Sequence, residues 1–216
     1  WGYEYWTYLT AQELIEKFNE SWKKQWFVIP TINPDGLQIA IDNNFEKSYY
    51  LNWRINSSGV DLNRSFCTYD FSYNEYVKKN QNFVSATVCN SQKETQIIKD
   101  VLEKYSFSEI ISLHSAWKIF YLPDNSFYDK KIIALALKLK KILPDYMYYS
   151  PSNNEEQNKK IIKTLEVNEW NTQDLKYTWM MENYIYHNFW IPVVLIEFTN
   201  HWVVEERLHN LVNYLD

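Results

Sequence analysis

Three short polar runs carry the side chains best suited to chemistry. Residues 59–66 have the sequence Gly-Val-Asp-Leu-Asn-Arg-Ser-Phe, which has no helical or strand period and joins a carboxylate, an amide, a guanidinium and a glycine. Asn33-Pro34-Asp35-Gly36 ends one apolar run, and Leu113-His114-Ser115 ends another. Polar groups at the ends of several buried strands predict one site, assembled at one edge of a sheet.

A fourth polar side chain, Glu197, stands inside the otherwise apolar run Val194-Leu195-Ile196-Glu197-Phe198. Burial of a carboxylate is costly unless the charge has a partner or a task. The run therefore predicts either a buried ion pair or a functional carboxylate.

Alternating helices and strands are expected to position these residues. The apolar periodicity predicts helices at 6–18 (beginning near residue 4), 91–104, 127–143, 179–189 and 203–215, and strands at 26–32, 107–114, 118–122 and 193–199. Asn33–Gly36 is predicted as a turn, and Ser91-Gln92-Lys93-Glu94 as a capping box that opens its helix. The irregular stretch 37–90 is long enough to carry function, and 150–176 is a polar surface excursion. Strands that alternate with helices predict an α/β sandwich around a central sheet.

Composition limits the classes of function. The 216 residues are enough for one domain, and the net charge of −5 argues against nucleic acid as the main partner. No apolar run is long enough for a transmembrane segment. Cys67 and Cys89 flank one loop, and either a disulfide or two reduced thiols fits the sequence. The chain has no initiator Met and is expected to be a fragment or a processed form, with an extracytoplasmic or secreted location favoured.

The order of the motifs resembles that of a known family. The motifs are Asn-Pro-Asp-Gly at 33–36, Asn52-Trp53-Arg54, Gly-Val-Asp-Leu-Asn-Arg at 59–64, and Leu-His-Ser at 113–115. Together they resemble the zinc metallocarboxypeptidases of the carboxypeptidase A and B type, and their spacing is most similar to bacterial enzymes that cleave γ-D-glutamyl-diaminopimelate bonds in peptidoglycan. The resemblance runs from residue 1 to about residue 200. It implies one catalytic domain over 1–216, with a mostly parallel or mixed twisted sheet between helices, lacking the family's N-terminal strands.

The resemblance also implies a zinc site. The family takes two ligands from His-x-x-Glu and a third from a His after a core strand, which match Glu4 and His114 here. Trp1 stands where the first His is expected, and indole has no lone pair for a metal. Zinc is therefore expected to bind weakly, with His201 as a candidate replacement ligand. Glu4 as a helix-start glutamate and His114 as a strand-end cap are the structural alternatives.

Further roles follow from the same resemblance. Glu197 corresponds to the general base, and Arg54 to the arginine that polarises the scissile carbonyl. Asn63 and Arg64 correspond to the clamp for the substrate's terminal carboxylate, for which a loop salt bridge is the alternative. Asp61 corresponds to the carboxylate that orients the first ligand; an ordinary turn-forming Asp is its alternative.

Two positions concern the substrate. Counting back from Glu197, the family's mobile tyrosine falls on Leu175, and Tyr177 lies two residues further along. The base of the specificity pocket falls at Glu182, whose carboxylate would favour Lys, Arg or the amine of diaminopimelate.

Two functions are therefore expected. The first is a zinc metallocarboxypeptidase that removes the C-terminal residue of a peptide or peptidoglycan stem. The second is a catalytically impaired, carboxypeptidase-like binding module that recognises a terminal carboxylate. Glu197, Arg54 and His114 favour the enzyme, whereas Trp1 and Leu175 favour the binding module.

Overall fold

The computed structural model describes residues 4–20, 25–44, 54–68, 88–115, 117–124, 126, 129–149 and 180–198. The predicted helix at 203–215 and the predicted excursion at 150–176 lie outside these residues, as do Trp1, Leu175, Tyr177 and His201.

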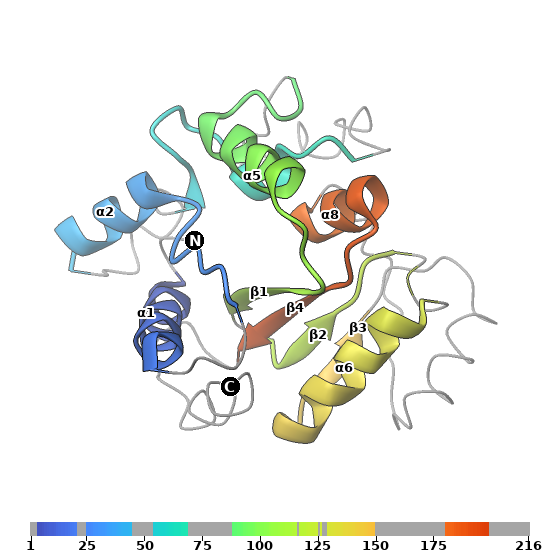
Figure 1. The fold of residues 1–216 in the computed structure, drawn as a ribbon. Coiled ribbons are helices and arrows are strands. Elements are labelled where there is room, and N and C mark those ends of the chain that lie inside the picture. Colours follow the sequence, from blue (N-terminus) through green and yellow to red (C-terminus); the bar gives the residue numbers. More distant parts are fainter. Residues whose placement is uncertain are drawn as a thin grey trace.

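A mixed four-stranded sheet organises the described chain (Figure 1). Its strands are β1 (Ile110–Ser115), β2 (Ile119–Tyr121), β3 (Met147–Tyr149) and β4 (Val193–Phe198), in the order β1-β4-β2-β3. The pairs β1–β4 and β2–β3 are parallel, and β2–β4 is antiparallel. The expected α/β class with a mixed sheet is confirmed.

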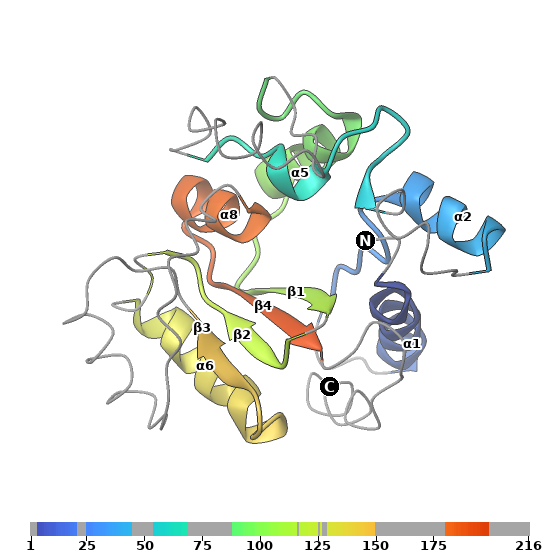
Figure 2. The same ribbon diagram turned by 180° about the vertical axis from the view of Figure 1, so that it is seen from behind.

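Helices lie on both sides of this sheet. The helices α5 (Lys93–Lys104) and α8 (Met181–Phe189) lie on one side, and α6 (Lys130–Ile142) lies on the other, in both views (Figures 1 and 2). The helix α1 (Tyr5–Glu20) contacts β1, and α2 (Pro34–Asp42) lies near α1. Among the described helices, none is long and apolar enough to cross a membrane.

The helix α6 shows how the pattern produces its packing. Ile132, Leu135, Ala136 and Leu139 recur at helical spacing, and all four are buried against the sheet core. The Asp129 side chain accepts a hydrogen bond from the Lys131 N–H and so caps the start of the helix. The helix ends before Pro144, as the sequence predicts.

The predicted strand at 26–32 is wrong. This segment is extended but forms no ladder among the described residues, and Phe27 and Ile29 are 49% and 37% exposed. An apolar run identifies a strand only when a neighbouring strand satisfies its backbone groups. The run instead forms one wall of a cavity beside β1.

The predicted turn at Asn33–Gly36 is the beginning of α2. The Asn33 side chain accepts a hydrogen bond from the Gly36 N–H at 3.0 Å, and Pro34 occupies the first helical turn. Asn followed by Pro is a known helix-start signal, so the sequence contained the information.

The predicted capping box at the start of α5 is also wrong, although the helix is present. Gln92 is the N-cap, and its side chain makes no capping hydrogen bond. Glu94, the expected box partner, instead accepts a hydrogen bond from Asn56 Nδ2 at 3.1 Å. A hydrogen bond to a residue distant in the sequence has therefore replaced the predicted local capping hydrogen bond of Glu94.

Cys67 and Cys89 form a disulfide across a sequence separation of 22 residues. Asn90 reinforces this junction, because its side-chain oxygen accepts a hydrogen bond from Cys67 N and its N–H donates one to Ser65 O. The bond therefore ties the 59–66 run to the start of α5.

Candidate active site

Two neighbouring strands bring His114 and Glu197 together. In the parallel pair β1–β4, His114 is the register partner of Glu197. Register partners in adjacent strands project their side chains from the same face of the sheet. An imidazole and a carboxylate that are 83 positions apart in the sequence (197 − 114) therefore share one face.

Glu4 reaches the same point from the chain segment that leads into α1. Its carbonyl oxygen accepts hydrogen bonds from both the N–H and the hydroxyl of Thr7, which fixes the beginning of the helix. Its side-chain Oε2 lies 3.2 Å from His114 Nδ1 and accepts a hydrogen bond from Ser115 N at 3.3 Å. Glu4 is 2% exposed and His114 5%, so the pair is buried.

Arg54 is held by the 59–66 run. Its Nε lies 2.6 Å from Asp61 Oδ2, while Asp61 Oδ1 accepts a hydrogen bond from Asn63 N. Asn33 Nδ2 donates to the carbonyl oxygens of Arg54 and Ile55, which fixes the backbone of this segment. Asp61 therefore positions Arg54, a partner that the sequence did not suggest.

The turn that returns the chain from Arg54 to Asp61 depends on Gly59. Gly59 has a φ of +74°, a conformation in which glycine is favoured over residues with a Cβ. Asn56 Oδ1 accepts hydrogen bonds from Ser58 N and Val60 N, and Asp35 Oδ2 accepts one from Ser57 N. The hydrogen bonds from Ser57 lower the pKa of Asp35.

Asn63 and Arg64 lie in the short 3₁₀ helix η2 (Leu62–Arg64). Asn63 is 4% exposed, and its Oδ1 accepts a hydrogen bond from Met181 N at the beginning of α8. Arg64 Nη1 donates to the carbonyl oxygen of Asn63, and its side chain is half-buried. This contact brings η2 against the helix that carries Glu182.

Glu182 lies in the first turn of α8 and is completely buried. Its Oε1 is 3.8 Å from His114 Nε2, on the opposite side of the imidazole from Glu4. Neither of its carboxylate oxygens has a hydrogen-bond partner among the described residues, and the same is true of Glu197 Oε2.

The crowded carboxylates shift one another's protonation. Burial raises the pKa of Glu197 to about 7, and the negative charges of Glu4 and Glu182 add to this effect. The positive charges of His114 and Arg54 oppose it. Burial alone would lower the pKa of His114 and raise that of Glu4. The contact between these two residues outweighs burial, so the His114 pKa is raised and the Glu4 pKa is lowered.

These residues fit a divalent cation. His114 Nδ1 and Glu4 Oε2 converge in a buried position, and buried carboxylate oxygens without hydrogen bonds leave an excess of negative charge that a cation would offset. Histidine nitrogen and carboxylate oxygen are both zinc ligands. Within the described ranges, no third His, Cys, Asp or Glu completes a ligand cluster with them.

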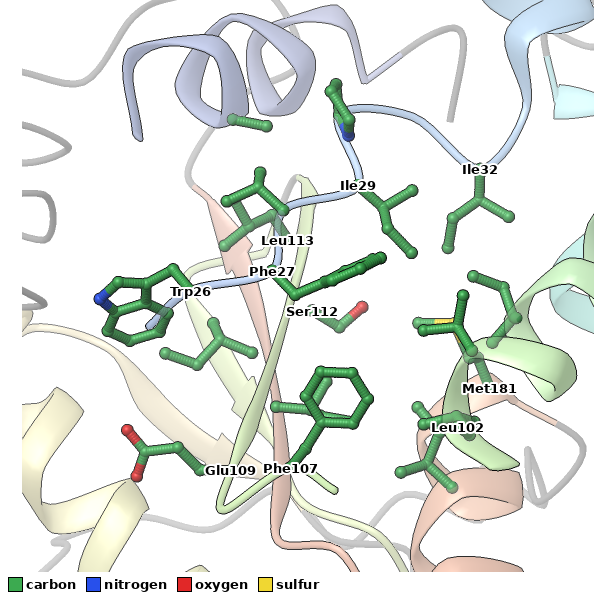
Figure 3. A pocket seen from close by; sticks show the side chains of 18 of the residues that line it. Trp26, Phe27, Ile29, Ile32, Leu102, Phe107, Glu109, Ser112, Leu113 and Met181 are labelled. Carbon is green, nitrogen blue, oxygen red and sulfur yellow. The ribbon is translucent and has the colours of Figure 1, made fainter. Parts of the chain in front are cut away.

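An apolar cavity of about 500 Å³ adjoins the site (Figure 3). It lies between the extended segment 25–32 and β1, with Leu102 of α5 and Met181 of α8 on its wall. Its lining includes His114, but among the described residues it includes neither Arg54 nor Glu197. The cavity therefore lies beside the charged cluster and touches it at the imidazole.

The structure brings together Glu4, His114, Glu182 and Glu197, with the Arg54–Asp61 pair and Asn63 around them. Tyr177 and the position occupied by Trp1 lie outside the described residues. The sequence did not indicate the contact between Glu182 and His114, because the two residues are far apart in the chain. An acidic residue in a first helical turn suggests only a favourable interaction with the helix dipole.

Comparison with known proteins assigns the family. Residues 5–193 match the model of the zinc carboxypeptidase family. The chain belongs to this family, whose peptidases are zinc-dependent.

Two relatives illustrate the similarity. The carboxypeptidase N catalytic chain of Homo sapiens is 32% identical over 106 residues, which are 46% of this chain and 23% of the relative. Carboxypeptidase B of Helicoverpa zea is 26% identical over 125 residues, which are 53% of this chain and 27% of the relative. The matched part spans about a quarter of each relative's length.

Proposed function

We propose that this protein is a zinc metallocarboxypeptidase that hydrolyses the C-terminal peptide bond of a peptide or of a peptidoglycan stem peptide. One observation carries the proposal. The partly buried Glu197, whose buried Oε2 lacks a hydrogen-bond partner in the described chain, lies beside the Glu4–His114 pair, and desolvation raises its pKa to about 7. A base with a pKa near the operating pH suits proton transfer.

Each residue has a distinct task in this proposal. Zinc bound through Glu4 and His114 would supply a Lewis acid and lower the pKa of a bound water molecule. Glu197 accepts the proton of the attacking water and later returns it to the leaving amine. Arg54, fixed by its 2.6 Å contact with Asp61, donates hydrogen bonds to the carbonyl oxygen as negative charge develops on it.

Substrate binding is assigned to the residues around η2. Arg64 and Asn63 bind the terminal carboxylate, and a planar guanidinium suits a bidentate contact with it. Tyr177 covers the bound residue. The Cys67–Cys89 disulfide favours an oxidising compartment, consistent with a peptidoglycan substrate outside the cytoplasm.

The decisive experiment compares peptides that differ only at the C-terminus. With added zinc, the chain should release one residue from a peptide or diaminopimelate stem with a free carboxylate, and none from the C-terminal amide. Glu197→Gln should lower the rate by about 10²–10⁴-fold, because an amide cannot accept the proton. Glu103→Gln, in an exposed ion pair with Lys99 on α5, is the matched control and should retain full activity.

The sequence also supports a second candidate function. Because Trp1 replaces the first ligand and Leu175 the tyrosine, the chain could bind terminal carboxylates without turnover. Carboxylate-dependent binding of the same peptides, without release of a residue even with added zinc, would replace the enzyme by the binding module.

A further inference from the structure

Trp117 is the most exposed large apolar side chain in the described part of the protein. It is 74% exposed, although it lies only three positions after the buried His114. Single exposed aromatic residues are common on protein surfaces, so the place of this one in the fold decides its meaning. Trp117 is not among the residues that line the apolar cavity, and it therefore belongs to a separate surface.

The sheet topology places Trp117 at the end of β4. In the order β1-β4-β2, β4 lies between the two strands that the connection containing Trp117 joins (Figure 2). Only residues 116–118 join Ser115 of β1 to Ile119 of β2. Neighbouring strands are about 4.8 Å apart, so this connection must cross roughly 10 Å, and the steps from residue 115 to residue 119 reach at most about 14 Å. The connection therefore has little slack and crosses directly at the carboxyl end of β4.

The register of the strands brings this crossing to Glu197. His114 and Ile119 are both register partners of Glu197, one in each of the strands that flank β4. Trp117 lies between these two partners in the chain, three residues after His114 and two before Ile119. The exposed indole therefore lies at the rim of the candidate active site.

The backbone next to Trp117 is held in a defined conformation. Lys118 has a φ of +54°, in the left-handed region that residues with a Cβ rarely adopt. Its carbonyl oxygen accepts a hydrogen bond from Met147 N at 3.0 Å, which ties the crossing to β3. Residues in such conformations persist where the surrounding structure holds them, and they are concentrated at active sites and ligand-binding sites. The support of the indole is therefore fixed before a ligand binds.

The proposed carboxylate clamp places the terminal residue of the substrate elsewhere. Asn63 contacts Met181 at the beginning of α8, so the clamp lies beside the helix that carries Glu182. A peptide bound there by its terminal carboxylate would present its scissile carbonyl to Glu197 and continue beyond it on the acyl side. The crossing at the end of β4 offers an exposed apolar ring to that continuation. The flat face of an indole favours aromatic and large aliphatic partners.

We propose that Trp117 is a specificity-determining residue, which packs against an aromatic or large aliphatic side chain on the residue immediately before the scissile bond. This inference rests on the proposed function for the direction in which the substrate lies. It narrows the substrate class to peptides with a large apolar residue at that place.

The first test compares peptides that share a terminal residue and differ only in the residue before it. With added zinc, the wild type should favour Phe over Gly at this place. Trp117→Ala should lower kcat/KM for the Phe peptide by about 10-fold and leave kcat/KM for the Gly peptide unchanged. The loss should appear in KM rather than in kcat, because the contact is made alike in the bound substrate and in the transition state. Trp117→Phe, which keeps an aromatic ring, should retain most of the preference.

Trp190→Ala is the matched control. Trp190 is 71% exposed and precedes the beginning of β4, at the opposite end of the strand from the crossing, so its loss should change the hydrolysis of neither peptide. Equal losses for the Phe and Gly peptides in Trp117→Ala would show a structural role and overturn the proposal, as would an unchanged preference for Phe. An effect limited to stem peptides that carry a glycan would assign the ring to a sugar and would also overturn it.

Binding measurements separate this inference from the proposed function. In Glu197→Gln, which should bind peptides without turnover, the Phe peptide should bind about 10-fold more tightly than the Gly peptide, and the added Trp117→Ala should remove this difference. The same binding preference, in a protein whose wild type releases no residue, would support the role of Trp117 and contradict the peptidase function alone. Release of the terminal residue without any preference that depends on Trp117 would contradict this inference alone.

Discussion

Polar atoms have different surroundings in two regions of the sheet, the side covered by α6 and the carboxyl ends of β1 and β4. On the α6 side, Phe120 packs against Tyr146 and Tyr148 with ring centroids 5.3 and 5.4 Å apart, and the Tyr148 hydroxyl donates a hydrogen bond to Ala136 O. Near the carboxyl ends of β1 and β4, both carboxylate oxygens of the buried Glu182 and the Oε2 of the partly buried Glu197 lack hydrogen bonds among the described residues. In the region packed against α6, the buried Tyr148 hydroxyl has a hydrogen-bond partner, as is usual in a stable core. In the region around Glu182 and Glu197, carboxylate oxygens have none among the described residues. Such departures are expected at functional sites, which the rest of the fold must stabilise.

If this contrast is correct, a core substitution should change stability and leave the site intact. Leu139→Ala, at a completely buried position of α6, should lower the free energy of unfolding by about 2–5 kcal/mol. The zinc affinity of the folded protein should not change. Leu137→Ala on the same helix, at a 37% exposed position, is the control and should shift stability by less than about 0.5 kcal/mol. Denaturant titrations followed by zinc titration of the folded fraction would measure both, and equal losses for the two variants would contradict the assigned core.

Removing the Cys67–Cys89 disulfide tests how much this bond stabilises the region around the 59–66 run. Replacing Cys67 and Cys89 by Ala should lower the free energy of unfolding by about 3 kcal/mol, because the bond closes a loop with a sequence separation of 22 residues. Asn90→Ala, which leaves the bond and removes the side-chain contact with Cys67 N, should cost only about 1 kcal/mol. A denaturation midpoint unaffected by loss of the bond would show that other contacts already hold the junction.

Completing the proposed ligand set should change metal binding more than stability. Trp1→His should raise zinc affinity by at least about 10-fold, because a missing ligand costs more than a missing partner of a ligand. Isothermal titration with zinc would measure it, and Trp1→Phe, which adds no ligand, is the control. Should Trp1→His bind zinc no more tightly than the wild type, the binding-module function is favoured over the peptidase.

The last prediction concerns the charge at Glu197. The pKa of this carboxyl is raised from 4.5 to about 7 in the folded protein, so the folded state binds the proton more tightly than the unfolded state. The contribution of Glu197 to the stability of the fold is therefore most favourable at a pH below 4.5, the pKa in the unfolded state, and is lost as the pH rises through about 7. In metal-free protein, Glu197→Gln should be more stable than the wild type above this window and no more stable below it. Melting curves across the window with a chelator present would show this crossover; a constant difference would contradict it.

The sequence predicted most of the helices and strands, and it missed contacts between distant residues. α6 and β4 have strong local patterns, so they lie close to their expected positions. The predicted strand at 26–32 failed because a strand requires a neighbour, which no local pattern encodes. The helix start at Asn33-Pro34 was recognisable by its residue types but was interpreted as a turn.

At the site, the motif order selected residues that the structure places near one another, whereas their pairings became visible only in three dimensions. Glu4 and His114 were expected together and lie 3.2 Å apart. The sequence gave no indication that Asp61 contacts Arg54, or that Glu182 faces His114, because each carboxylate was assigned one task from its motif. The roles predicted for the site residues all remain predictions: Glu4, Arg54, Asp61, Asn63, Arg64, His114, Tyr177, Glu182 and Glu197.

The contacts that build the site span long stretches of chain, and this affects when it can form. The hydrogen bond from Ser115 to Glu4 crosses 111 residues, and that from Met181 to Asn63 crosses 118. Contacts between distant residues form late in folding, because the intervening chain must be ordered first. A nascent chain that does not yet include Glu197 lacks the proposed general base, and a partly folded one lacks the pairing of β1 with β4 that sets Glu197 beside His114. The proposed peptidase would thus be latent during its own synthesis, and hydrolytic competence would arise only with the completed fold.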